Sequence, residues 1–333
     1  MVRMMFCKTP NISRVLRRAI GGLSLTLMPL LGQAEVYNMP APGSDLIGQI
    51  QFIKARHEDT LIDIARRFSL GQDEIVMANL KVDRWLPGEG KEVLVPRQFI
   101  LPDAPRAGIV LNIPEMRLYY YPGGGPKTQA TQVITYPVSI GRMDWRTPLG
   151  ATRVIQKIKD PSWRPPETIK EEHAKNGDIL PDVVPPGPNN PLGQFAMKLG
   201  VPGYLIHGTD VDKSYGIGMR VTHGCIRMYP EDIQKLYPLI PVGTPVYLVN
   251  QTIKLGWLGD ALYIEVSQPL DEDRMTYEQL LSVAMSQIEK KIARKPVILD
   301  GAALKKALKT PTGVPVVISK PVEEQQQETL QVF

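Results

Sequence analysis

Prolines and glycines divide the middle of this chain into short apolar segments, and this pattern limits the possible folds more than any other feature of the sequence. The chain has 31 prolines and 28 glycines in 333 residues, and both residue types are unfavourable inside helices. Between residues 106 and 249 they separate segments such as GIVLN, RLYYY and VYLVN, whose composition is typical of strands. The sequence therefore predicts a mostly β fold, a strand-rich sandwich or barrel, rather than a helical bundle.

One stretch of this strand-rich region has a different character. Residues 160–193 contain PSWRPP and PDVVPPGPNNPLG on either side of a polar, helix-compatible piece, ETIKEEHAKNG. So many prolines argue against a central strand, and long ordered loops often form lids or the walls of binding sites. We expect this insertion to border the functional site.

The N-terminus has the features of an export signal. Five basic residues and no acidic residue precede Glu35, an apolar run covers residues 19–31, and the small-residue segment GQA ends at Ala34. The apolar run is shorter than the ~20 residues that a membrane-spanning helix needs. We therefore expect residues 1–34 to be a signal peptide and the chain to have no stable membrane span. An uncleaved N-terminal anchor is the alternative.

Removal of such a signal changes both the charge and the cysteine content of the chain. The formal net charge is +5, and the five basic residues before Glu35 account for all of it. The mature chain then has no excess of positive charge for a nucleic-acid partner. Cys7 would be lost with the signal, which leaves Cys225 as the single thiol. An unpaired cysteine in an exported protein is either buried or kept for its reactivity.

Residues 50–96 predict a small α+β unit of the order β-α-α-β. An alternating strand comes first, and Thr60 is placed to cap a helix whose apolar residues Leu61, Ile64 and Phe68 share one face. A second short helix follows, and PGEGKEVLVP predicts a turn and a closing strand. The next residues, 97–107, are typical of a linker.

This unit resembles a LysM module in DTLIDIARRF, ANL and the closing VLVP. It departs from the family at His57, Glu58 and Asp59, where LysM modules usually have a glycine before the aspartate. The resemblance implies binding of glycan that contains N-acetylglucosamine, which here means peptidoglycan. A packing module without a ligand is the alternative.

Rare residues gather in the stretch HGTDVDKSYGIGMRVTHGCIRM. A thiol attacks carbonyls as a thiolate and needs a neighbouring base, usually histidine. His223 lies two residues before Cys225, which places both side chains on one face of an extended segment. His207 ends the strand YLI and can reach the sulfur if the loop returns to that strand. Gly224 permits a tight turn with backbone N–H groups for an oxyanion hole, and Arg227 is placed to bind a substrate carboxylate.

Two other interpretations fit the same residues. Zinc would find Cys225, His223 and His207, but structural zinc sites need four ligands and no CxxC or HxxxH spacing occurs here. We therefore expect no metal. A turn glycine beside a buried cysteine, with no chemistry, would also explain the three residues HGC.

The pattern H-G-T…T-H-G-C-I-R-M resembles the signature of the L,D-transpeptidase catalytic domain of the YkuD type. That signature is a histidine, a gap, then Ser/Thr-His-Gly-Cys, an apolar residue, and Arg or Asn. The resemblance runs over residues 106–249 and includes TPLG at 147–150 and PNNPLG at 188–193. The LysM-like module and the proline-rich insertion make the chain similar to one subgroup of this family, the periplasmic enzymes that act on Gram-negative peptidoglycan.

The resemblance implies a role for each residue of the signature. Cys225 is the nucleophile, and His207 is its base, with the other ring nitrogen held by a backbone carbonyl near Gly208. His223 lines the site and assists the thiolate or the oxyanion. The residues expected to bind substrate are Thr222, Gly224, Arg227 and Gly208.

The implied reaction is peptidoglycan L,D-transpeptidation. The thiolate attacks the carbonyl of the third residue, diaminopimelate, of a donor tetrapeptide stem. It becomes acylated and D-alanine is released. An amine then takes the acyl group and gives a 3–3 cross-link or attachment to a lysine of an outer-membrane lipoprotein, whereas water gives hydrolysis. The implied partners are peptidoglycan stems and glycan strands, and no metal or nucleotide cofactor is needed. The alternatives are a catalytically silent peptidoglycan-binding structural protein, and an L,D-carboxypeptidase or cysteine peptidase.

Residues 250–333 are expected to form a C-terminal extension without chemistry of its own. WLGDALYIEVSQPL predicts a hairpin, TYEQLLSVAMSQIEKKI an amphipathic helix, and VPVVIS a further strand. The polar end, EEQQQETLQVF, is typical of a disordered tail.

Overall fold

The computed structural model describes residues 35–125, 127–210 and 212–320. The predicted signal, residues 1–34, and the predicted disordered tail, residues 323–333, lie outside the described residues. Strands outnumber helices in the described chain, so the prediction of a mostly β fold is confirmed. Over the same residues, no helix combines the length and the apolar character that crossing a membrane would require.

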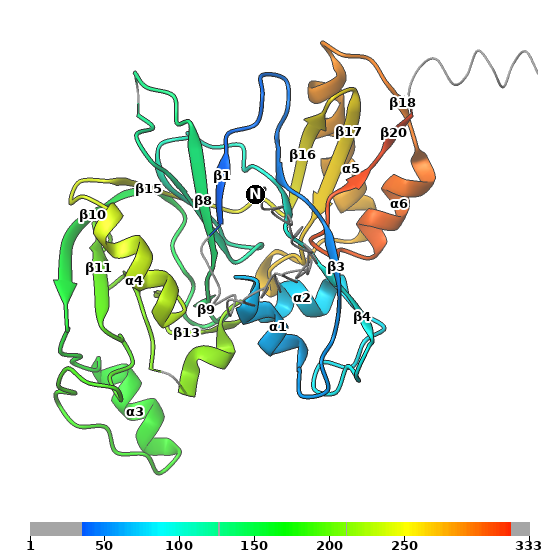
Figure 1. The fold of residues 1–333 in the computed structure, drawn as a ribbon. Helices are drawn as coiled ribbons and strands as arrows, with labels where there is room; N and C mark the ends of the chain where they lie inside the picture. Colours follow the sequence, from blue (N-terminus) through cyan, green and yellow to red (C-terminus); the bar gives the residue numbers. More distant parts are fainter. Residues whose placement is uncertain (1–34, 126, 211, 321–333) are drawn as a thin grey trace, which may run out of the picture. The chain divides into compact units, whose positions relative to one another are not determined.

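A nine-stranded sheet forms the centre of the described chain (Figure 1). Most neighbouring strands are antiparallel, but β15 lies parallel to β6, and β12 lies parallel to β14. The sequence segment that holds the candidate thiol therefore reaches this sheet at its β12–β14 edge. In sheet order the strands are β1 (Glu35–Asn38), β8 (Gln132–Pro137), β7 (Arg117–Tyr121), β6 (Gly108–Asn112), β15 (Pro245–Val249), β10 (Gly150–Lys159), β11 (Phe195–Leu199), β12 (Leu205–His207) and β14 (Ile226–Arg227).

Both faces of this sheet are buried at β6, β7 and β8, which are rich in apolar residues, whereas most of β10 is exposed or half-buried. Along β6, Ile109 and Leu111 belong to one hydrophobic core, and Val110 between them belongs to another. Helix α4 (Pro230–Leu239) covers the face that carries Ile109 and Leu111, and its Ile233 and Leu236 belong to the same core, the first core. The N-terminal module, residues 50–96, supplies much of the second core, to which Val110 belongs.

Residues 50–96 form the predicted β-α-α-β order in β3 (Gln51–Lys54), α1 (Leu61–Arg67), α2 (Gln72–Ala78) and β4 (Glu92–Val95). Strands β3 and β4 pair antiparallel. Thr60 caps α1 as predicted: its hydroxyl accepts a hydrogen bond from the Asp63 N–H, and the Asp63 carboxylate accepts one from the Thr60 N–H. Leu61 and Ile64 of α1 are fully buried in the second core. The module is thus packed onto the sheet.

The segment expected to be a linker, residues 97–107, contains a strand. β5 (Gln98–Ile100) pairs antiparallel with β2 (Leu46–Gly48). The expectation failed because QFI is too short to show an alternating pattern, and its partner strand lies about fifty residues earlier in the chain.

The C-terminal residues have a hydrophobic core of their own, which Leu262, Ile264, Leu280 and Ile318 share with other apolar side chains. The predicted hairpin, helix and last strand are all present. Sequence reasoning missed α6, whose start Asp300 caps through its carboxylate. The elements are β16 (Ile253–Leu258), β17 (Ala261–Val266), η2 (Asp271–Asp273), α5 (Tyr277–Ile292), β18 (Ile298–Leu299), α6 (Gly301–Lys309), β19 (Val316–Val317) and β20 (Ser319–Lys320).

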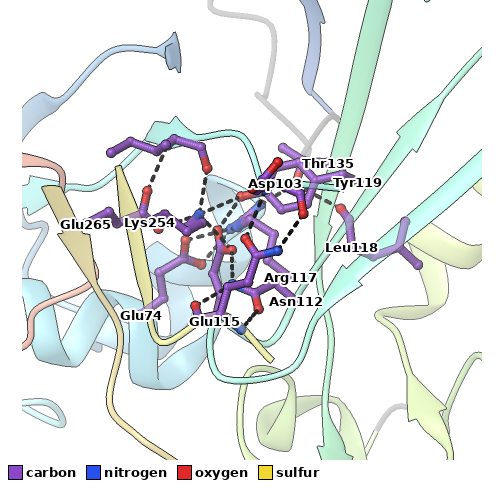
Figure 2. A network of polar contacts seen from close by, with 12 residues as sticks. Glu74, Asp103, Asn112, Glu115, Arg117, Leu118, Tyr119, Thr135, Lys254 and Glu265 are labelled. Atoms are coloured by element: carbon purple, nitrogen blue, oxygen red, sulfur yellow. Dashed lines mark hydrogen bonds and ion pairs between the residues drawn. The ribbon is translucent and has the colours of Figure 1, made fainter. Parts of the chain in front are cut away.

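A buried polar network joins the C-terminal part to the central sheet (Figure 2). The Lys254 ammonium lies 2.8 Å from Glu115 and 2.7 Å from Glu265, and it also donates to the Ile100 carbonyl. Close by, the buried Arg117 guanidinium pairs with Glu74 of the N-terminal module at 2.6 Å. Buried charges are tolerated only when they are paired and hydrogen-bonded, so these contacts fix how the three parts of the chain meet.

Candidate active site

The pairing of β12 with β14 brings together the residues that the sequence singled out. His207 lies opposite Arg227, and Ile206 lies opposite Ile226. Both isoleucines are fully buried in the first core. Because side chains alternate along a strand, His207 and Arg227 point to the other side. Cys225 directly precedes β14, and the Arg227 charge affects the pKa of both the Cys225 thiol and the His207 ring. The thiol, an imidazole and a guanidinium therefore come near one another at this sheet edge.

The His207 ring is fixed in one tautomer. Its Nδ1 lies 2.6 Å from the Gly208 carbonyl oxygen, and a carbonyl can only accept, so Nδ1 carries the proton and Nε2 keeps its lone pair. Burial, and next the nearby Arg227 charge, lower the pKa of His207 from 6.5 to about 3, although the Gly208 hydrogen bond opposes them. The ring is neutral at physiological pH and can accept a proton through Nε2.

Cys225 is a protonated thiol in this environment. Burial raises the pKa of the thiol, while the Leu205 backbone and the Arg227 charge act in the opposite direction. The Sγ atom lies 3.6 Å from the Gly203 carbonyl oxygen, to which the S–H donates. A neutral thiol beside a neutral imidazole is a pair in which attack on a carbonyl requires proton transfer from sulfur to nitrogen.

The backbone between β13 (Arg220–Thr222) and β14 bends sharply at Gly224, which has φ +95°. This bend shows that the expectation of an extended segment from His223 to Cys225 is wrong: the glycine, with no Cβ, lets the chain turn between two strands. Thr222 is buried, and its hydroxyl donates to the Cys225 carbonyl at 2.7 Å. Thr222 therefore acts on the position of Cys225 through the backbone.

A second threonine holds the bend from the opposite side. The Thr147 hydroxyl donates to the Gly224 carbonyl at 2.8 Å and accepts from the Gly141 N–H at 3.0 Å. Gly141 belongs to β9 (Ile140–Gly141), which pairs with β13. Thr147 is the first residue of the TPLG segment that carried part of the family resemblance. Its hydrogen bond to Gly224 shows what this segment does in the structure: it holds the bend before Cys225.

The proline-rich insertion reaches the site through Glu172 of α3 (Glu167–Lys175). One Glu172 carboxylate oxygen lies 3.1 Å from His223 Nε2 and also contacts the Arg142 guanidinium. These two partners lower the pKa of Glu172 to about 2, Arg142 more strongly than His223. The Trp145 ring packs edge-on against His223, with ring centroids 5.2 Å apart. The insertion thus borders the site, as predicted.

His223 is held by these contacts and has a different environment from His207. Burial lowers the pKa of His223, and the Arg142 charge adds to that effect, while the Glu172 carboxylate opposes it. Sequence reasoning did not find Glu172, Arg142 or Trp145. The only available signal for Glu172 was the acidic character of ETIKEEHAKNG inside an insertion expected to border the site.

Arg227 has an unused hydrogen-bonding capacity. In the described part of the chain, no hydrogen bond or ion pair reaches its guanidinium, and the buried Nε has no partner. Burial lowers the pKa of Arg227, while Asp210 and Cys225 act in the opposite direction. A guanidinium without a partner in the described chain can bind a carboxylate.

The chain is similar to known proteins over most of its length. A family model described as the L,D-transpeptidase catalytic domain, YkuD, matches residues 106–248. The chain is 37% identical over 289 residues to the probable L,D-transpeptidase YbiS of Escherichia coli K12, covering 85% of this chain and 92% of the relative.

Two further relatives have similar names. The probable L,D-transpeptidase YcfS of the same strain is 35% identical over 299 residues, covering 88% of this chain and 91% of the relative. The probable L,D-transpeptidase ErfK/SrfK of Salmonella typhimurium is 39% identical over 246 residues, covering 73% and 77%. The chain therefore belongs to the L,D-transpeptidase family and is a transferase.

Proposed function

We propose that the protein acts on peptidoglycan by a cysteine mechanism, with Cys225 as the nucleophile and His207 as its base. The observation that supports this proposal is the β12–β14 pairing, which sets His207, with its unprotonated Nε2, opposite Arg227, two residues after Cys225. The substrate is a donor tetrapeptide stem, and the thiol attacks the carbonyl of its third residue, diaminopimelate.

In the first half-reaction, His207 Nε2 takes the proton of the Cys225 thiol as the sulfur attacks the carbonyl carbon. A carbon–sulfur bond forms, and the carbonyl electrons move to an oxyanion near the backbone N–H groups of Gly224 and Cys225. When the intermediate collapses, the bond to the terminal D-alanine breaks. The imidazolium returns its proton to the departing amine, which leaves a thioester.

In the second half-reaction, an amine attacks the thioester carbonyl and His207 takes its excess proton. The carbon–sulfur bond breaks, and the thiolate recovers that proton from the imidazolium. The amine of a second diaminopimelate side chain gives a 3–3 cross-link, and the lysine of an outer-membrane lipoprotein gives an anchor. If water takes this place, the product is a hydrolysed stem, as in an L,D-carboxypeptidase.

Donor recognition depends on charge. Peptide stems carry carboxylates, and Arg227 offers a guanidinium with no partner among the described residues. His223, held by Glu172 and Arg142, forms a wall of the same site. We propose that Arg227 binds a donor carboxylate, and that Gly208 contributes by fixing the His207 ring.

The signal-like residues 1–34 support export, and we propose the periplasm as the place of action. The LysM-like module would then hold the enzyme on glycan strands. Its α2–β4 connection exposes Leu80, Trp85 and Leu86, with 61% of the Trp85 surface accessible. The Asp83 carboxylate fixes this connection by accepting from the N–H groups of Trp85 and Leu86. Three large apolar side chains exposed within one connection make it the candidate glycan-binding surface.

The decisive experiment incubates the purified protein with disaccharide-tetrapeptide and records masses. We expect release of D-alanine and an acyl adduct on Cys225, both of which disappear in Cys225→Ala. A protein that binds sacculi but never forms the adduct would instead be a silent peptidoglycan-binding protein. An adduct that is resolved by water alone, even with excess acceptor amine, would identify a peptidase.

The module is tested separately with insoluble sacculi. Trp85→Ala should weaken co-sedimentation of the protein with sacculi and leave the acylation rate on soluble fragments unchanged. Unchanged co-sedimentation would show that this surface does not bind glycan.

A further inference from the structure

The structure assigns Arg66, a residue of the N-terminal module, to the positioning of the catalytic segment; this inference rests on the function proposed above. Arg66 lies in α1, far in sequence from the thiol. Its Nη1 donates to the Ser214 hydroxyl at 3.1 Å. Its Nε and Nη2 donate to the two carboxylate oxygens of Glu231 at 2.8 and 3.0 Å.

The two partners of Arg66 lie on opposite sides of Cys225 in the sequence. Ser214 belongs to η1 (Asp212–Gly216), in the connection that leaves β12 after His207 and returns toward β13. Glu231 lies in the first turn of α4, which begins shortly after β14. One guanidinium therefore joins the chain before the nucleophile to the chain after it. A bidentate arginine–carboxylate pair also fixes orientation as well as distance.

Backbone contacts reinforce the same junction. The N–H of Gln72 donates to the Ile217 carbonyl at 2.9 Å. Gly71 and Gly218 touch so closely that a Cβ added to Gly218 would lie 2.2 Å from the Gly71 Cα. After Cys225 in the sequence, the Tyr229 hydroxyl donates to the Leu70 carbonyl at 3.3 Å.

Short hydrogen-bonded steps lead from this junction to the strand that carries the site. The Ser139 hydroxyl donates to the Gly216 carbonyl at 2.6 Å. The backbone of Ser139 also exchanges two hydrogen bonds with Arg227, at 2.8 and 3.0 Å. A shift of the η1 connection is therefore transmitted to β14, whose register with β12 sets the place of the thiol relative to His207.

Deletion of the N-terminal module would remove part of the second core. Leu61, Ile64 and Leu70 of the module share one hydrophobic core with Val110 and Tyr119 of the sheet. Without the module these sheet residues would be exposed to water, and the chain would lose its fold. Single substitutions at the junction avoid this difficulty.

The experiment compares Arg66→Ala with Arg67→Ala in the full-length protein. Arg67 is the next residue of α1, but its guanidinium pairs with Asp59 inside the module, so Arg67→Ala is the matched control. Displacement of reacting groups by about 1 Å can reduce a rate about 100-fold. We expect Arg66→Ala to lower the rate constant for acylation by soluble disaccharide-tetrapeptide at least about tenfold, with donor affinity unchanged. Arg67→Ala should acylate at the wild-type rate.

Two further measurements separate positioning from simple loss of stability. Alkylation of Cys225 by iodoacetamide, which needs no donor peptide, should slow in Arg66→Ala but not in Arg67→Ala. The double variant Arg66→Glu with Glu231→Arg should recover most of the acylation rate, because the pair is restored with its charges exchanged. Urea unfolding identifies the conditions in which all variants are folded.

Equal acylation and equal alkylation of Arg66→Ala and the wild type, measured on folded protein, would overturn the inference. Equal slowing in Arg67→Ala would overturn it as well, since a general weakening of α1 would then explain the effect. Failure of the wild-type protein to acylate would refute the proposed function instead, and the alkylation ratio would still decide the role of Arg66.

Discussion

Replacing Gly224 with alanine tests whether the bend beside the thiol sets the reaction rate. Gly224 has φ +95°, a left-handed backbone that costs other residues roughly 1–2 kcal/mol. An added Cβ would lie 2.8 Å from the Tyr204 ring, whereas carbon atoms in contact are about 3.5–4.0 Å apart. The ring is held because the Tyr204 hydroxyl donates to the Arg146 carbonyl at 3.1 Å, and loss of that bond costs about 1 kcal/mol. We expect Gly224→Ala to lower the free energy of unfolding by about 2–3 kcal/mol.

The effect on catalysis should be larger than the effect on stability. The N–H groups of Gly224 and Cys225 are the proposed donors to the oxyanion, and loss of one such donor typically costs about 100- to 1,000-fold in rate. We expect the acylation rate constant of Gly224→Ala to fall about 100-fold. Mass spectrometry of the acyl-enzyme, formed from disaccharide-tetrapeptide on folded protein, measures it directly.

Gly243 is the matched control for this substitution. Its φ is +94°, but nothing lies within 4 Å of an added Cβ. Gly243→Ala should therefore cost only the backbone strain, roughly 1–2 kcal/mol, and acylate at the wild-type rate. If Gly224→Ala acylates as fast as the wild type, or if the control is slowed equally, then the bend does not set the rate and the reasoning is refuted.

His207→Ala should slow acylation more than His223→Ala, as acyl-enzyme formation rates would show. Because the pKa of His207 is lowered from 6.5 to about 3, its contribution to the free energy of unfolding should be complete above pH 6.5 and lost as the pH falls toward 3. Urea midpoints across that range measure the loss, and a midpoint that rises on acidification would contradict it. Glu172→Gln should lower the pKa of His223, since the carboxylate raises it; NMR titration of the ring proton tests this. Lys254→Met should cost about 3–5 kcal/mol in urea unfolding by leaving two buried carboxylates without their cation, whereas Lys291→Met, which breaks a half-exposed pair, should cost under about 1 kcal/mol.

The sequence was sufficient for features that depend on neighbours in the chain. The helix that Thr60 caps begins at Leu61 as expected, because the capping box and the apolar spacing are both local patterns. The mostly β fold followed from the spacing of prolines and glycines in the same way. The TPLG segment was marked only by resemblance, and its role appeared when Thr147 was found bonded to the carbonyl of Gly224.

Features that depend on contacts between distant residues could not be predicted. Glu172 reaches His223 across 51 positions of sequence, and nothing in the segment ETIKEEHAKNG distinguishes that carboxylate from its neighbours. The bend at Gly224 was recognised, but the segment around it was expected to be extended. The pairing of His207 with Arg227, which joins residues 20 positions apart, brings His207 to the strand that follows Cys225.

In the proposed mechanism, the two histidines have different roles. His207 is buried, neutral and fixed in one tautomer by a backbone carbonyl, which suits proton transfer to and from sulfur. His223 is held by Glu172 of the insertion and by Arg142, so its position depends on the wall of the site. A donor stem that displaces Glu172 would change the charge around His223 and leave His207 as it is. We therefore expect substrate binding to alter the environment of His223 before it alters that of the base.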